Sequence, residues 1–225
     1  MRLGGRKQRA VLALLLLEEG HVVAADRLID ELWGLEPPED APTALQAHVS
    51  RLRRALPDGP AVLATQPPGY VLRIGDDQLD AQRFRRLVAA GRAALEDDRN
   101  EEAAERLREA LRLWRGRALE DRREEDCAVR AAGRLEEERL EALELRVEAD
   151  LRLGRHHELL PELGALAQQQ PLRERLAAQR MLALYRSGRQ AEALEAYAQA
   201  RRVLVAELGL EPGPELQRLQ GGILS

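Results

Sequence analysis

Apolar positions in the first third of the chain follow first a helical and then a strand-like spacing. Leucine, valine and isoleucine crowd residues 6–18 and recur along 24–33, which predicts two helices packed on a core. Residues 43–56 carry apolar side chains three or four positions apart, which predicts a third helix. Short, mostly apolar runs at 61–65 and 70–74, separated by Gln-Pro-Pro-Gly, predict a β-hairpin with a four-residue connection. Three helices followed by a hairpin form the pattern of a winged helix-turn-helix domain.

The third predicted helix is amphipathic, and its polar side is basic. Its apolar stripe is formed by Leu45, Val49, Leu52 and Leu56, with no carboxylate between the first and the last of these. Small residues allow close approach to a DNA groove, arginine can bind phosphate or guanine, and Gln or Ser can hydrogen-bond base edges. A solvated amphipathic helix would show the same periodicity, and the winged-helix context is what favours DNA recognition. The candidate contact residues on this side and its flanks are Thr43, Gln46, Ala47, Ser50, Arg51, Arg53 and Arg54.

Polar and glycine-proline positions predict the ends of this helix and the shape of the hairpin. Thr43 and Gln46 have the spacing of a capping box, so we expect the helix to begin at Thr43. The run Pro57–Pro60 is expected to stop it. In this fold the third helix lies in the major groove, and the hairpin wing reaches the neighbouring backbone or minor groove. The candidate wing residues are Gln66, Gly69, Tyr70 and Arg73, of which Tyr70 could equally pack the hairpin onto the domain.

The remaining two thirds of the chain reads almost entirely as helix and contains an internal repeat. Gly154 and Gly188 lie 34 positions apart, the tetratricopeptide period, and each is followed by an arginine and then, in register, by a glutamate. A third copy has Asp98 at the glycine position, and about 22 additional residues, placed at 116–137, separate it from the regular spacing. Each copy is predicted to form a helix, a tight turn and a helix. Such arrays bind proteins or peptides, or only dimerise or rigidify a neighbouring domain. The charged run Arg117–Asp126 is predicted as a solvated face or loop.

Charge distribution and composition narrow the classes of function. The chain has 225 residues and a formal net charge of −4, yet residues 1–9 and the third helix are basic and free of acid. Acids of the first third gather instead at 18–40, as in a DNA-binding module with a separate acidic face. One cysteine, Cys127, excludes an intramolecular disulfide and a multi-cysteine metal site, and fits a reducing cytoplasm. The apolar run 10–17 is too short to cross a bilayer.

The sequence predicts no catalytic or metal-binding set. None of the four histidines has a cysteine or second histidine at a strong metal-ligand spacing, and Cys127 has no evident activating partner. Lys7 is the only lysine and is not part of a Gly-Lys-Ser/Thr motif, so a phosphate-binding P-loop is not expected. We therefore expect a protein that is not an enzyme and uses no cofactor or metal.

Motifs in both parts of the chain resemble those of one family. In the first part they are LGGRKQRAVLALLLL (3–17), DRLIDELWG (26–34), ALQAHVSRLRRAL (44–56) and PPGYVLRI (67–74), and in the second ALRLWRG (110–116) and residues 134–163 and 181–220. The first set resembles the OmpR-like winged helix, and the second the tetratricopeptide-like bacterial transcriptional activation domain, of the SARP-type transcriptional activators that regulate antibiotic pathways in actinobacteria. The resemblance covers nearly the whole chain in the right order. The lack of a P-loop matches the small members of the family, which have no ATPase module.

This resemblance implies particular partners, and the chain departs from the family pattern at three places. It implies binding to direct repeats in double-stranded promoter DNA, in tandem or as a homodimer, and recruitment of RNA polymerase. In related winged helices the loop between the second and third helices, here Gly34–Pro42, contacts polymerase. The family has a sheet before the first helix, whereas only Met1–Gly5 precede that helix here. Either the start of the sequence is misassigned or this member has lost the sheet. Gln66 replaces the usual wing arginine, and the charged residues 121–126 replace an apolar stretch.

Together these observations predict a mainly α-helical protein of two domains. A winged helix-turn-helix domain at 1–75, N-terminally short, is followed after a short polar joint by a tetratricopeptide-like domain at 79–225. The predicted function is that of a cytoplasmic, sequence-specific DNA-binding activator of secondary-metabolite genes. The alternative is a protein-interaction module whose truncated first domain no longer binds DNA. A third hypothesis is a sensor that binds a small ligand in the repeat groove.

Overall fold

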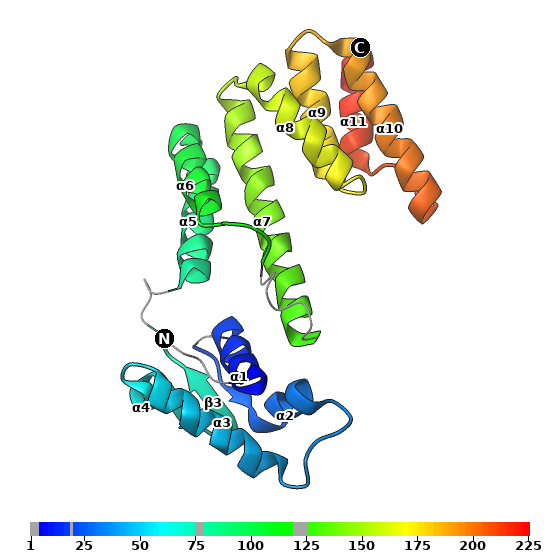
Figure 1. Cartoon of the computed structure of the whole chain (residues 1–225). Coiled ribbons are helices and arrows are strands. Elements are labelled where there is room, and N and C mark those ends of the chain that lie inside the picture. The colour runs from blue at the N-terminus through cyan, green and yellow to red at the C-terminus, as the bar shows by residue number, and fades with distance from the viewer. Residues whose placement is uncertain (1–4, 19, 75–78, 119–125) are drawn as a thin grey trace. The chain divides into compact units, whose positions relative to one another are not determined.

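Two compact units make up the chain, and the computed structural model describes residues 5–18, 20–74, 79–118 and 126–225. Unit 1 comprises Met1–Arg83 and Trp114–Glu138, and unit 2 comprises Phe84–Leu113 and Arg139–Ser225. The elements from α1 (Arg6–Leu17) to β3 (Gly69–Leu72) belong to unit 1, and those from α8 (His156–Gln169) to α11 (Pro214–Leu224) belong to unit 2 (Figure 1). The predicted architecture, a winged helix followed by a helical domain, is confirmed.

Three helices and a small sheet enclose the core of the winged helix. Leu15, Leu28 and Leu52, one from each of the three long helices, are fully buried in it. On each helix the apolar residues recur with the helical period, which places them on the side that faces this core. The helices are α1 (Arg6–Leu17), α2 (Ala25–Trp33), α3 (Ala41–Ala55) and the single turn α4 (Gly59–Val62).

The sheet has three antiparallel strands in the order β1-β3-β2. They are β1 (Val23–Ala24), β2 (Leu63–Gln66) and β3 (Gly69–Leu72). Tyr70 in the central strand is paired with Val23 on one side and Thr65 on the other. The short strand β1 thus extends the predicted hairpin to a three-stranded sheet.

Several predicted boundaries in the winged helix were wrong. The third helix begins at Ala41, not at Thr43, because the side chain of Asp40 caps it by accepting a hydrogen bond from the backbone N–H of Thr43 at 3.1 Å. The first hairpin strand begins at Leu63, not Ala61, because Asp58 adopts a left-handed conformation (φ 50°) and the next residues form α4. The strands also extend further toward each other, so that only Pro67-Pro68 connect them.

Unit 2 is built from helices, most of which are joined by short turns. Its later helices pack in sequence order, α8 against α9 and α9 against α10, and α11 lies against α9 and α10 (Figure 1). Met181 and Leu216 are fully buried in the apolar core between α9, α10 and α11. The helices, of which α5 and α7 begin in unit 1, are α5 (Asp80–Glu96), α6 (Asn100–Arg112), α7 (Asp126–Arg152), α8 (His156–Gln169), α9 (Glu174–Arg186), α10 (Gln190–Leu208) and α11 (Pro214–Leu224).

The three predicted repeat turns share one backbone conformation. Asp98, Gly154 and Gly188 have φ values of 57°, 79° and 77°. The N–H of the following arginine donates in each turn to a carbonyl five residues earlier, at 2.8, 3.0 and 2.9 Å respectively. This is the Schellman arrangement, in which a left-handed residue closes the end of a helix. Helix pairs α5–α6, α7–α8 and α9–α10 are thus joined alike.

Several features predicted from the sequence lie outside the described residues. Residues 1–4, where the family's preceding sheet would end, are among them, as are 75–78, which contain the polar joint. Most of the predicted charged loop, 119–125, is also outside the described part.

Candidate nucleic-acid interface

The polar face predicted for the third helix is present on α3 and exposed. The apolar side of the helix, with Leu45, Val49 and Leu52, is buried in the core of the winged helix. The opposite side meets solvent because the helical period carries the polar positions away from that core. Ala47 is half-buried among them. The exposed members of the predicted set are Thr43, Gln46, Ser50, Arg51 and Arg54.

Two arginines on this face carry guanidinium groups that are available for a ligand. Arg51 makes no hydrogen bond or ion pair within the described part of the chain. The Nε of Arg54 donates only a long hydrogen bond, 3.5 Å, to the carbonyl of Ser50 in its own helix. No carboxylate interrupts α3. The face can therefore accept an anionic or hydrogen-bonding partner.

Arg53 behaves differently from its two neighbours. It is half-buried, and its guanidinium points to the hairpin. Its Nε donates to the carbonyl of Leu63 and its Nη2 to the hydroxyl of Thr65, both at 2.7 Å. The helical period alone predicted a surface contact residue, since it cannot show where β2 lies. In the structure Arg53 joins α3 to β2.

The four predicted wing residues divide into an exposed pair and a buried pair. Gln66 and Arg73 are exposed, and the Nη2 of Arg73 donates to the side-chain oxygen of Gln66 at 2.9 Å. Gly69 and Tyr70 are buried, which places Gly69 away from a surface contact and gives Tyr70 the packing role that was its predicted alternative. Tyr70 belongs to the core with 8% of its surface exposed. A Cβ on Gly69 would lie 1.9 Å from the carbonyl oxygen of Val23, so glycine is needed for β1 to approach β3.

A cluster beside α3 was not predicted from the sequence. The ammonium of Lys7 lies 4.7 Å from the centre of the Trp33 ring and donates to the carbonyl of Leu32 at 3.0 Å. The Trp33 ring lies 6.1 Å from that of His48 on α3. Burial, and secondarily the charges of Arg51 and Lys7, lower the pKa of His48. Burial and nearby Arg6 lower the pKa of Lys7. These residues come from three helices, and no spacing in the sequence links them.

The loop between α2 and α3 is exposed along its whole length. Residues 34–40 all face solvent, and Leu35 is fully exposed. Gly34 ends α2 with φ 57°, which turns the chain away from the helix. Acidic residues flank the apolar tip, since Glu36 follows Leu35 and Glu39 lies near α3. An exposed leucine in such a loop suits contact with another protein.

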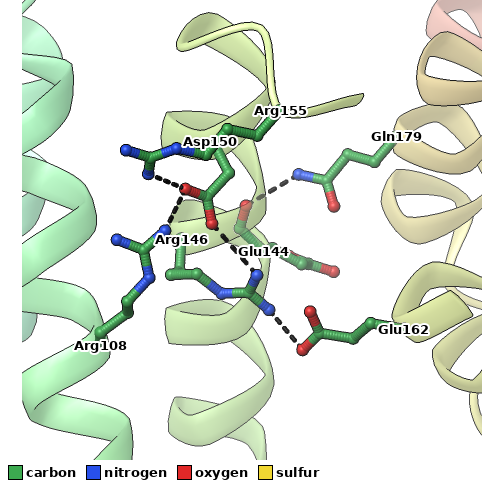
Figure 2. A network of polar contacts seen from close by, with 7 residues as sticks. All are labelled: Arg108, Glu144, Arg146, Asp150, Arg155, Glu162 and Gln179. Atoms are coloured by element: carbon green, nitrogen blue, oxygen red, sulfur yellow. Dashed lines mark hydrogen bonds and ion pairs between the residues drawn. The ribbon is translucent and has the colours of Figure 1, made fainter. Parts of the chain in front are cut away.

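Unit 2 contains a network of charged side chains around the buried Asp150 and Arg146 on α7, to which α6, the residue before α8 and α8 itself contribute (Figure 2). The carboxylate of Asp150, 3% exposed, accepts hydrogen bonds from Arg108, from Arg146 at 3.2 Å and from Arg155 at 2.7 Å. Figure 2 shows Arg146 between Asp150 and Glu162, to which it also donates. Every charge in the network has a partner, so it fits a structural role better than a ligand site.

The described residues contain neither a metal-type cluster nor a membrane span. No group of three or more His, Cys, Asp or Glu side chains gathers there as metal ligands would. No helix in the described ranges is long and apolar enough to cross a bilayer.

Two families match the chain in sequence. The bacterial transcriptional activator domain matches residues 79–224, and the family described as transcriptional regulatory protein, C terminal, matches residues 3–72. The regulatory protein DnrI of Streptomyces peucetius is 46% identical over an alignment of 228 positions, which covers 97% of this chain and 84% of DnrI. The regulatory protein AfsR of Streptomyces coelicolor is also 46% identical, over 98% of this chain but only 22% of AfsR. The proteins matched in this way are named as regulators.

A solved structure has the same fold over the whole chain. It is that of Mycobacterium tuberculosis EmbR in complex with a low-affinity phosphopeptide, with a TM-score of 0.94 and 39% sequence identity. The match covers 100% of this chain and 60% of the EmbR chain. The winged helix and the helical domain therefore occur together, in this order, in a longer regulator.

Proposed function

The chain belongs to the SARP-type family of bacterial transcriptional activators, and we propose that it binds promoter DNA sequence-specifically to activate transcription. The observation that supports this most directly is the outer face of α3, which is exposed, basic and free of carboxylate. A helix of this kind can enter the major groove of DNA. The proposed function is binding and recruitment, without catalysis or a cofactor.

The proposed contacts follow from exposure and chemistry. On α3 the small and polar residues Thr43, Gln46, Ala47 and Ser50 would lie against base edges, and Arg51 and Arg54 would contact phosphate or guanine. On the wing, Arg73 held by Gln66 would reach the neighbouring backbone or minor groove. Gly69 and Tyr70 are left out because they are buried.

We further propose RNA polymerase as the protein partner of the α2–α3 loop. Leu35 offers an exposed apolar side chain there, between acidic neighbours. We also propose that the protein binds direct repeats, in tandem or as a dimer, at promoters of secondary-metabolite genes. The chain spans most of DnrI but 22% of AfsR, so activities of the longer relative are not carried over with it.

The salt dependence of DNA binding tests the proposed face. The probe is a duplex enriched by the full chain from a random-sequence library, with a scrambled duplex alongside. Because each phosphate contact contributes about one unit to the slope of log K against log salt, Arg51→Ala with Arg54→Ala should lower the slope by about two. Arg27→Ala is the matched control, since Arg27 is an exposed arginine on α2 paired with Glu18 at 3.0 Å.

Each result has a separate meaning. An unchanged slope in the double variant would contradict the role given to this face. Equal, weak binding of the unmodified chain to both duplexes would instead favour the protein-interaction alternative for the whole chain.

A further inference from the structure

One guanidinium connects the two DNA-facing elements of the winged helix. Arg53 projects from α3 and donates from Nε to the Leu63 carbonyl and from Nη2 to the Thr65 hydroxyl, both at 2.7 Å. The carbonyl belongs to the start of β2, and the hydroxyl lies beside the tip of the hairpin. Two short bonds from a planar, rigid fork fix direction as well as distance.

The main chain around Arg53 is held as tightly as its side chain. A Cβ on Gly59, the first residue of α4, would lie 1.8 Å from the carbonyl oxygen of Arg53, so α4 begins in direct contact with the end of α3. The connection from α3 to β2 is therefore short and closely packed. Within it, Arg53 supplies the polar side-chain link from the helix to the strand.

The wing is held from its second strand as well. Thr65, which Arg53 contacts, is followed by Gln66, which accepts from Arg73 at 2.9 Å. Successive strand residues point to opposite faces, so the two arginines hold the tip of β2 from both sides. Arg53 is half-buried, whereas Arg73 is exposed.

We propose that Arg53 is a positioning residue that holds the wing at a fixed distance and angle from α3, rather than a residue that itself contacts DNA. This inference rests on the proposed DNA-binding function. A protein that reads a groove with a helix and a neighbouring groove with a wing must hold both in register. Because Arg53 links α3 to β2, replacing its side chain changes how the wing binds DNA.

The test separates position from charge. Arg53→Lys keeps the charge but loses the fork, Arg53→Gln removes the charge, and Thr65→Val removes one acceptor without touching an arginine. Hydroxyl-radical footprints and salt titrations are recorded on a duplex enriched by the full chain. We expect Arg53→Lys to weaken binding about fivefold, as for the loss of a hydrogen bond, and to remove wing protection while α3 protection remains.

Two further results are expected. Arg53→Gln should give the same salt slope as Arg53→Lys, because both variants lose the wing and differ only in a charge that contacts no phosphate, and Thr65→Val should reduce wing protection in the same direction as Arg53→Lys. Arg27→Lys is the matched control, since Arg27 is an exposed arginine of α2 outside the proposed contacts, and wing protection should survive in it. Circular dichroism establishes that each variant is folded, and Thr65→Val remains informative if an Arg53 variant is not.

The contrary outcomes are distinct. Full wing protection in Arg53→Lys, or in Thr65→Val, would overturn the inference. A slope about one lower in Arg53→Gln than in Arg53→Lys would also overturn it, by showing a direct phosphate contact of Arg53. Failure of the unmodified chain to enrich any duplex would instead overturn the proposed function on which the inference rests.

Discussion

His48 is the side chain on α3 whose charge is most sensitive to the fold around it. It lies beside Trp33, and burial together with Arg51 and Lys7 lowers its pKa. The unfolded chain therefore takes up a proton more readily than the folded one, near the ordinary histidine pKa of about 6.5. The contribution of His48 to stability is complete above that pH and is lost as the pH falls below it.

The corresponding experiment is urea unfolding followed by Trp33 fluorescence in a Trp114→Phe background. We expect the free energy of unfolding to decrease between about pH 7.5 and pH 5.5, because the unfolded state binds more protons there. His48→Gln should reduce this dependence. The same decrease in both proteins would mean that His48 has no part in it.

Individual residues also show what a sequence can and cannot predict. The exposed set on α3 was predictable because exposure on a helix follows from spacing alone. The helix start was not, since Asp40 and Thr43 are both suitable caps and only the loop geometry selects Asp40. The partner of Arg53 lies ten residues away on a strand, and that contact depends on tertiary packing.

At the scale of the elements, the turns between helices restrict the residue type, because their backbone conformation requires a positive φ. Gly188 has φ 77°, a conformation in which a Cβ is strained, so Gly188→Ala should destabilise unit 2 by about 1 kcal/mol. Gly164 is the matched control. It lies inside α8, nothing lies within 4 Å of a Cβ built there, and Gly164→Ala should stabilise by about 0.5 to 1 kcal/mol.

Urea unfolding followed by circular dichroism measures both changes. Gly188→Asn should lose less stability than Gly188→Ala, since Asn and Asp tolerate the left-handed region and Asp98 adopts it in the equivalent turn. If both alanine variants changed stability with the same sign, the turn conformation would not be the cause.

The elements that were predicted well are those with a clear sequence signature. A repeated glycine with an arginine and a glutamate in register marked the turns, because backbone geometry requires a residue that tolerates positive φ. The equivalence of Asp98 to the glycines was predictable for the same reason. The hairpin was placed less accurately, since α4 is only four residues long and β1 is two, too short for either to show a period.

At the scale of the whole molecule, the local distribution of charged residues is more informative than the net charge. The net charge of −4 would argue against a nucleic-acid partner, yet α3 is free of acid. In unit 2, opposite charges are brought together inside the fold, where Arg108 and Asp150 meet across 42 positions of sequence. Such a pairing has no local signature and could not have been predicted from the sequence.

The Asp150 carboxylate gives the sharpest test of how that internal charge stabilises unit 2. Asp150→Asn would leave the guanidinium groups of Arg108, Arg146 and Arg155 around a neutral amide in a buried site. Breaking a buried pair from one side costs about 3 to 5 kcal/mol. Arg146 would keep Glu162, and the side chains of Arg108 and Arg155 are 36% and 33% exposed, so we place the loss at the lower end, about 3 kcal/mol. We expect a loss of this size in urea unfolding followed by circular dichroism.

Glu162→Gln supplies the comparison within the same network. The Glu162 side chain is 43% exposed, so water can compensate Arg146 when the charge of Glu162 is removed, and the loss should stay at or below about 1 kcal/mol. Equal losses in the two variants would mean that burial does not set the strength of this network. A much larger loss for Asp150→Asn would identify the arginine cluster around Asp150 as a structural centre joining α6 to α7.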